Sequence, residues 1–185
     1  MSICNKLSFR SKKKRWKYIY ILHPFEVATI VSTMTKDEEV LAAAVLHDVP
    51  EECDININEI TKLFGKRVGE LVDLETEPKY PDLSKSKSWI LRKQDDLNKL
   101  KQNDDIGFKM MFLSDKLSNI RAIYRIYLEK GLDAFNMLNF NDIESQAWFY
   151  YEILDNISEL NETEAYKEYE KKLDLIFKNV KRADK

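Results

Sequence analysis

A histidine and an aspartate stand side by side where this chain is best suited to chemistry. The stretch AAAVLHDVPEE, residues 42–52, begins as an apolar helix and then delivers His47 and Asp48, followed by Glu51 and Glu52. Four ionisable groups in six residues are costly to bury on an apolar segment unless a cation pairs with them. A divalent metal ion would be such a cation, although adjacent His and Asp residues at a helix end also occur by chance in many soluble proteins.

The second histidine favours the metal site. The chain contains 2 His, and His23 stands directly before Pro24 and another apolar helical stretch. Asp115 lies on a third apolar stretch, with Asn119 four residues later on the same helix face. Two imidazoles and two carboxylates suit Mn, Fe or Zn, with positions left open for water or substrate. The candidate ligands are His23, His47, Asp48 and Asp115.

The order of these residues resembles the H…HD…D signature of the HD-domain phosphohydrolases. Four phrases in the same order, HPFEVATIV, LAAAVLHDVPEEC, FGKRVGELVD and FLSDKLSNIRAI, are similar to the hydrolase domain of the RelA/SpoT family. The single-domain relatives of that family are the small alarmone hydrolases. The resemblance covers about residues 14–130. It implies an all-α HD-domain bundle, Mn²⁺ as the cofactor, and removal of pyrophosphate from the 3′ position of guanosine tetra- or pentaphosphate (ppGpp or pppGpp).

The resemblance also implies roles for residues beside the ligands. Glu51 and Glu52 match the family's Glu-Asp pair, which orients the attacking water or passes a proton to the leaving oxygen. Glu52 is one methylene longer than the family's aspartate. Asn119 resembles the asparagine that contacts the nucleotide. On the same helix, but placed on other faces by their spacing, Lys116 and Arg121 are alternative candidates for a phosphate contact.

Two further segments match the family less closely. The family phrase Val-Asp-Gly-Val-Thr-Lys reads VDLETE at residues 72–77, so Thr76 is a candidate substrate contact and Glu77 replaces a lysine. The basic run KKKR at residues 12–15 is either a solvated patch or a source of cations for a polyphosphate, and its candidates are Lys14 and Arg15. Arg92 and Lys93 stand where the family also has an Arg-Lys pair, and a solvated helix face explains them equally well.

Helices must position all of these residues, because the periodicity from Pro24 onward is helical and no strand is apparent. A capping box of Thr35 and Glu38 predicts the start of the helix that leads to His47, and Pro50 should stop it. The remaining expected helices are 56–65, 68–74, 85–102, 104–131, 134–138, 141–160 and 163–182. The last is amphipathic, so its apolar face covers either the core or a partner subunit in a homo-oligomer.

Composition sets the remaining limits. A chain of 185 residues and 21.9 kDa suits one HD-type domain over residues 1–185, with a core at about 14–130 and C-terminal helices at about 141–182. The net charge of −2 gives no reason to expect a nucleic-acid or membrane surface. Two cysteines make no disulfide framework, and no run approaches the roughly 20 apolar residues of a membrane span. We therefore expect a cytoplasmic protein whose partner is a small phosphorylated nucleotide.

Three functions follow from this sequence. The first is a stand-alone ppGpp hydrolase, since the chain is too short to hold the synthetase and regulatory domains of the long family members. The second keeps the metal chemistry but acts on another phosphorylated nucleotide or phosphoester, which the altered loop before Glu77 makes credible. The third is a non-catalytic nucleotide-binding module, against which the presence of both Glu51 and Glu52 counts.

Overall fold

The computed structural model describes residues 21–53 and 55–184, and every regular element in these ranges is a helix. The all-α fold class predicted from the sequence is confirmed. The chain divides into two compact units, the first made of residues 1–76 and 106–114 and the second of residues 77–105 and 115–185. A single HD-type domain over residues 1–185 stays a prediction. No helix within the described residues has both the length and the hydropathy of a membrane span.

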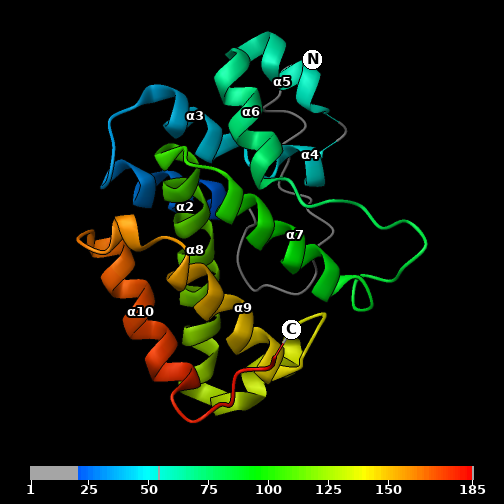
Figure 1. Ribbon diagram of the computed structural model, residues 1–185, viewed down its shortest axis with the longest axis vertical. Coiled ribbons are helices and arrows are strands. Elements are labelled where there is room, and N and C mark those ends of the chain that lie inside the picture. Colours follow the sequence, from blue (N-terminus) through cyan, green and yellow to red (C-terminus); the bar gives the residue numbers. More distant parts are fainter. Residues whose placement is uncertain (1–20, 54, 185) are drawn as a thin grey trace. The chain divides into compact units, whose positions relative to one another are not determined.

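The first unit is built mainly from short helices (Figure 1). They are α2 (Leu22–Ser32), α3 (Glu38–Leu46), α4 (Val49–Glu52), α5 (Ile57–Phe64), α6 (Lys66–Glu75) and the first part of α8 (Ile106–Lys130). Helix α3 packs against both α2 and α6, and α6 also packs against α5. Their buried side chains are mainly aliphatic, and include Val27, Val31, Val40, Ala43, Ala44, Ile60, Leu71 and Val72.

Local capping explains where these helices begin. Helix α5 begins after Asn56, as expected, and Asn56 and Glu59 form a capping box there, because each side chain accepts a hydrogen bond from the other's backbone N–H. The box predicted at Thr35 is wrong. Asp37 caps α3 instead, since its carboxylate accepts from the backbone N–H of Glu39, and Thr35 accepts from the N–H of Asp37. An aspartate two residues later offers a charged acceptor at the positive helix end.

Pro50 follows the end of α3 as expected, but it lies inside a further short helix. Helix α3 ends at Leu46, close to the expected position, but a one-turn helix α4 begins at Val49 with Pro50 in its first turn. The missing N–H of a proline costs nothing there, because the first N–H groups of a helix have no intrahelical partner. Glu51 and Glu52 consequently lie on a helix.

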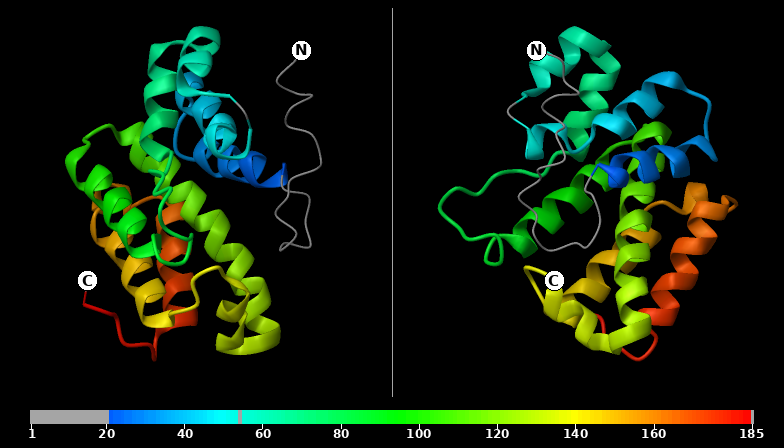
Figure 2. Two further views of the ribbon diagram at one scale, coloured as in Figure 1. Left: turned by 90° about the vertical axis from the view of Figure 1, so that its right-hand side faces the viewer. Right: turned by 180° about the vertical axis from the view of Figure 1, so that it is seen from behind.

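The second unit contains longer helices (Figures 1 and 2). They are α7 (Trp89–Gln102), the second part of α8, α9 (Ile143–Asp155) and α10 (Glu164–Phe177), with 3-10 turns η1 (Gly131–Met137) and η2 (Ser158–Leu160). Helix α9 contacts both α7 and α10, and α9 and α10 run in opposite directions (Figure 1). Helix α7 begins four residues later than predicted, and α9 and α10 are shorter than predicted.

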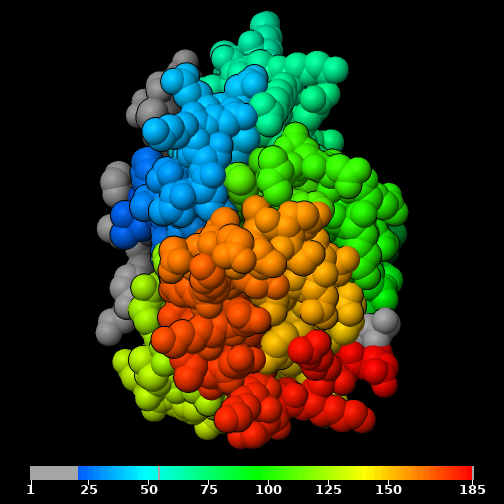
Figure 3. Space-filling model, turned by 60° about the vertical axis from the view of Figure 1, so that its left-hand side comes forward, coloured from blue at the N-terminus to red at the C-terminus, as the bar shows by residue number. Residues whose placement is uncertain are grey.

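Aromatic residues fill the core of the second unit. Trp89 stacks on Phe140 with ring centroids 4.5 Å apart, and the Tyr169 hydroxyl donates to the carbonyl of Tyr150 over 3.1 Å. The apolar face of α10 is buried, at Ala165, Tyr169, Leu173, Ile176 and Phe177. Its other face lies on the surface, coloured orange to red in Figure 3. The apolar side of this helix therefore serves the core, which is one of the two roles expected for it.

Candidate metal centre

His47 is oriented by its own helix. It is the C-cap residue of α3 and is buried, with 3% of its surface exposed. Its Nδ1 lies 2.8 Å from the carbonyl oxygen of Ala44, one turn earlier. A carbonyl oxygen only accepts hydrogen bonds, so Nδ1 carries a proton, and the lone pair of the neutral ring is on Nε2. Histidines that bind metals are commonly held in this way, with the second ring nitrogen donating to a backbone carbonyl.

Asp48 and His23 bring two more donor atoms to the Nε2 side of His47. The Oδ2 atom of Asp48 lies 3.4 Å from Nε2 of His47 and 3.7 Å from Nε2 of His23. The two imidazole rings meet edge to face, with centroids 5.3 Å apart. All three residues belong to the first unit, and one ligand atom from each lies within 4.8 Å of the others.

The break between α3 and α4 places Asp48 in this group. Its ψ of −4° departs from the value of about −42° that continues an α-helix, so the chain leaves the α3 axis at this residue. Asp48 occupies the N-cap position of α4, yet its side chain makes no capping hydrogen bond there. Its carboxylate instead faces the two imidazoles, His23 being carried by the first turn of α2.

These three residues fit a divalent ion. Two ligand atoms that bind one ion at about 2.1 Å lie roughly 3 to 4.2 Å apart, depending on the angle between them. The separations of 3.4 Å and 3.7 Å at Asp48 fall within that range. Imidazole nitrogen and carboxylate oxygen are the donor types of hydrolytic metal sites, and three protein donors leave positions for further ligands.

Glu51 and Glu52 lie one turn beyond Asp48. Their backbone N–H groups donate to the carbonyl of Asp48 over 3.2 Å and 3.0 Å, which ties α4 to this residue. Both side chains are exposed. Exposed carboxylates on a helix that starts at the metal-site aspartate can accept or deliver a proton without acting as ligands.

Asp115 lies on α8 in the second unit, and both of its carboxylate oxygens are hydrogen-bonded. Asn119 donates to Oδ1 over 3.0 Å, which confirms that the two residues share a helix face. The Nζ atom of Lys116 donates to Oδ2 over 2.5 Å. Asp115 and Lys116 are both buried, and a buried carboxylate held by a lysine and an amide is fixed in orientation.

A comparison with protein families shows which family carries these residues. The model described as the HD domain matches residues 5–133, which include all four candidate metal ligands. The chain belongs to the HD-domain family. The match also covers the basic run at residues 12–15, the Glu51-Glu52 pair and Asn119.

Two curated relatives of this HD-domain chain are much longer proteins. It is 36% identical over 107 residues to the guanosine-3′,5′-bis(diphosphate) 3′-pyrophosphohydrolase of Vibrio cholerae, which is 56% of this chain and 15% of that protein. It is 35% identical over 116 residues to the GTP pyrophosphokinase rsh of Brucella melitensis, which is 62% of this chain and 15% of that protein. The chain thus matches only a small part of these curated relatives.

Two solved structures are of similar size to this HD-domain chain. The crystal structure of lmo0812 from Listeria monocytogenes matches with a TM-score of 0.73 and 26% identity, over 85% of this chain and 99% of that one. A metazoan ortholog of SpoT, described as hydrolysing ppGpp, matches with a TM-score of 0.64 and 29% identity, over 94% of this chain and 90% of that one.

The remaining predicted substrate contacts are Thr76, Lys14, Arg15 and Arg121. Thr76 is the C-cap residue of α6, and its hydroxyl donates to the carbonyl of Val72 over 2.8 Å. Lys14 and Arg15 lie outside the described residues. Arg121 on α8 contacts Glu168 on α10 through two hydrogen bonds, of 2.8 Å and 2.5 Å. This pair connects two helices of the second unit.

Sequence reasoning missed a partly buried ionic cluster in the second unit. Glu77 contacts both Arg92 and Lys93 of α7, and Lys93 also lies 3.0 Å from Asp96. Arg92 and Lys93 are therefore partly buried and paired with acidic side chains, and they do not lie on a solvated helix face. The spacing of Lys93 and Asp96, three residues apart on one helix, was the available signal. Nothing in the sequence indicated that Glu77, in the preceding loop, would join them.

The cluster changes the acidity of Glu77. Burial raises the pKa of this carboxyl, but Lys93, Arg92 and Lys116 together outweigh burial and hold its pKa at about 2. A pKa this low means that Glu77 is ionised throughout the range in which an enzyme works, and that the cations around it stay paired with a negative charge.

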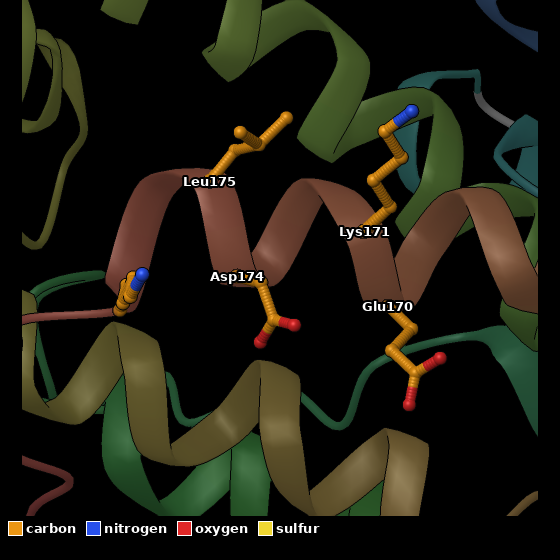
Figure 4. Close-up of a pocket in the computed structure, with 5 residues that line it drawn as sticks. Glu170, Lys171, Asp174 and Leu175 are labelled. Atoms are coloured by element: carbon orange, nitrogen blue, oxygen red, sulfur yellow. The ribbon is translucent and has the colours of Figure 1, made fainter.

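A shallow depression on α10 contains none of the predicted site residues (Figure 4). It is lined by Glu170, Lys171, Asp174 and Leu175 of this helix and by Lys178, its C-cap residue. Figure 4 shows that Lys171 and Leu175 point to one side of α10 and Glu170 and Asp174 to the other. They do not converge on a common point, so the depression offers no set of donors for a ligand.

Proposed function

We propose that this chain is a metal-dependent hydrolase that removes pyrophosphate from the 3′ position of ppGpp or pppGpp and leaves GDP or GTP. The observation that carries the proposal is the cluster of His23, His47 and Asp48, one ligand atom from each lying within 4.8 Å of the others in a member of the HD-domain family. A relative and a structural neighbour named for this activity support the choice of substrate.

The first part of the proposal concerns the metal. His23, His47 and Asp48 would hold a single divalent ion, with Mn²⁺ as the proposed ion and Asp115 as the proposed fourth ligand. When bound, such an ion lowers the pKa of water from about 16 towards 7 and offsets negative charge on phosphoryl oxygens. The hydrogen bond from Nδ1 of His47 to the Ala44 carbonyl makes Nε2 the nitrogen that carries the lone pair in the neutral ring, as this role requires.

The second part concerns proton transfer and the substrate. Attack of a water oxygen on the phosphorus next to the ribose breaks the bond to the 3′ oxygen, which needs a proton as it leaves. Glu51 and Glu52, exposed on α4, are proposed to orient the water and to deliver that proton. The proposed substrate contacts are Asn119, Lys14, Arg15, Thr76 and Lys116, with the cations facing phosphate groups.

One sequence feature favours a second candidate substrate. Glu77 stands where the family phrase has a lysine after Thr76. The carboxylate of Glu77 forms ion pairs with Arg92 and Lys93. A substrate contact that depends on a lysine at this position is thereby lost. Another 3′- or 5′-phosphorylated nucleotide is therefore the alternative substrate for the same metal chemistry.

The test is release of pyrophosphate from ppGpp by the purified chain with added Mn²⁺. We expect release by the wild-type chain and none by Asp48→Ala, because that change removes the carboxylate between the two histidines. Asp73→Ala, an exposed aspartate on α6 of the same unit, is the matched control and should keep full activity. A wild-type chain that binds Mn²⁺ but hydrolyses only other nucleotides from a panel would replace ppGpp with the second candidate. Hydrolysis of none of them would contradict the proposed reaction.

A further inference from the structure

Glu77 is shared by cations from two different helices of the second unit. Its two carboxylate oxygens contact Arg92 and Lys93, which are neighbours on α7. Lys116 of α8 also acts on Glu77, since its positive charge contributes to the low pKa of the glutamate. A carboxylate that serves three cations at once is more than the partner of one surface ion pair.

The partly buried positive charge of Lys93 is stabilised by the carboxylate of Glu77. Its side chain is largely buried, with 12% exposed, and its Nζ lies 3.0 Å from Asp96 and 4.7 Å from the centre of the Phe149 ring. Burial lowers the pKa of Lys93, and Asp96 and Glu77 more than reverse this effect, so its pKa is raised. The charge of Lys116 opposes them, which means that the two lysines repel each other. Glu77 attracts both.

Lys116 connects this cluster to Asp115. Its Nζ donates to Oδ2 of Asp115 over 2.5 Å, while Asn119 holds the other carboxylate oxygen. The Lys116 ammonium group is therefore attracted by the charges of Asp115 and Glu77 and repelled by that of Lys93. Any change of charge at Glu77 alters the forces on Lys116, and through it those on Asp115.

We propose that Glu77 is a positioning residue, which keeps the Asp115–Lys116 pair in place by neutralising Lys93 and Lys116 together. The proposal rests on the proposed function in one respect, namely that Asp115 is a metal ligand. It assigns a role to the acid that replaces the family's lysine, at a position where the sequence suggested only a lost substrate contact.

Removal of this charge has a defined consequence for Asp115. In Glu77→Gln the positive charges of Lys93 and Lys116 lose their shared counter-ion, and Asp115 must balance more of the charge of Lys116. A carboxylate bound more strongly to a lysine is a poorer ligand for a cation. Changes in the partners of metal ligands typically weaken metal binding by about 10- to 100-fold, and we expect about tenfold here.

The experiment is a calorimetric titration of the metal-free chain with Mn²⁺ alone. Wild type is compared with Glu77→Gln, Asp115→Asn and the double variant, so that the four affinities form a double-mutant cycle. If Glu77 acts through Asp115, the double variant binds Mn²⁺ about as weakly as Asp115→Asn. Additive losses, or an unchanged affinity in Glu77→Gln, would overturn the proposal.

Two further variants separate positioning from general stability. Glu168→Gln is the matched control, because Glu168 also binds an arginine and a lysine in the second unit, Arg121 and Lys172. It should leave Mn²⁺ affinity unchanged. Glu77→Gln with Lys93→Gln removes one charge of each sign and should restore most of the affinity that Glu77→Gln loses, even if the single variant folds poorly. Failure of this rescue in a folded double variant would contradict the proposed electrostatic cause.

The outcomes distinguish this proposal from the proposed function. A wild-type chain that binds Mn²⁺ but releases no pyrophosphate contradicts the hydrolase assignment, while the titrations still measure the role of Glu77. A wild-type chain that hydrolyses ppGpp, together with a Glu77→Gln variant of unchanged Mn²⁺ affinity, leaves the function standing and removes the positioning role.

Discussion

Burial separates the residues suited to metal binding from those suited to proton transfer, although they are neighbours in sequence. His47 is buried and fixed by Ala44, whereas Glu51 and Glu52 are exposed on the next helical turn. A ligand benefits from a fixed orientation, because a rigid donor loses little freedom when the ion binds. A proton donor must instead be able to reach the substrate and to exchange protons with solvent, and an exposed carboxylate meets both requirements.

This division predicts the effect of removing one carboxylate. Glu51→Gln should lower kcat for pyrophosphate release by about 10²- to 10⁴-fold, the usual contribution of a general acid or base. Its affinity for Mn²⁺ should stay that of the wild type. Steady-state kinetics combined with a Mn²⁺ titration checks both parts, with Glu38→Gln, an exposed glutamate at the start of α3, as the control. A parallel loss of metal affinity would make Glu51 a ligand instead.

At the level of single residues, the sequence identified His23, His47 and Asp48 as a group, because histidines are rare in this chain and each stands at a helix end. The proximity of Asp115 and Asn119 followed equally from helical spacing. The sequence could not identify the Ala44 carbonyl as the partner of His47, since every residue carries a carbonyl. The ion pairs of Glu77 with Arg92 and Lys93 could not be predicted either, because loop residues have no periodicity that relates them to a helix.

Among the helices, the α5–α6 pair depends on one close contact. Gly69 of α6 is buried against Thr61 of α5, and a Cβ atom at Gly69 would lie 2.0 Å from the Thr61 hydroxyl oxygen and 3.2 Å from its Cα. The hydroxyl can rotate away, but the backbone cannot do so without moving α5. Helix α6 in turn packs against α3, which ends at His47.

Gly69→Ala should therefore destabilise the protein, although alanine is the better helix former. We expect a loss of about 1–3 kcal/mol from overpacking, measured by urea unfolding. Thr61→Ala in the same chain should recover part of this loss, because it removes the hydroxyl but leaves the backbone contact. A more stable Gly69→Ala variant would show that helix propensity outweighs the contact.

Helix boundaries were predicted best where a cap has a specific chemistry. Asn56 and Gly65 mark the ends of α5 as expected, since an amide side chain caps one end and glycine adopts a φ of 101° at the other. Prediction failed where two residues compete. Asp37 outcompetes Thr35, and the first turn of a helix tolerates Pro50. Both outcomes depend on which backbone N–H groups need a partner, and spacing alone does not reveal this.

At the scale of the whole molecule, the ionic cluster links stability to pH. The pKa of Glu77 is about 2 in the folded protein, against an ordinary value of 4.5. A carboxyl whose pKa is lowered by folding stabilises the folded state above its unfolded pKa, and this contribution disappears as the pH falls towards the folded pKa. The shift corresponds to a contribution on the order of 3 kcal/mol at neutral pH.

The free energy of unfolding should therefore differ between wild type and Glu77→Gln by a few kcal/mol at pH 7, and this difference should shrink from about pH 4.5 downward. Urea unfolding of the metal-free chains at pH 7, 5, 4 and 3 measures it. Glu70→Gln is the control, because Glu70 forms an exposed pair with Lys66 and should differ from wild type by less than about 1 kcal/mol. A difference that stays constant over the whole range would mean that Glu77 stabilises the fold by packing, because only a charge that is lost on protonation makes the difference depend on pH.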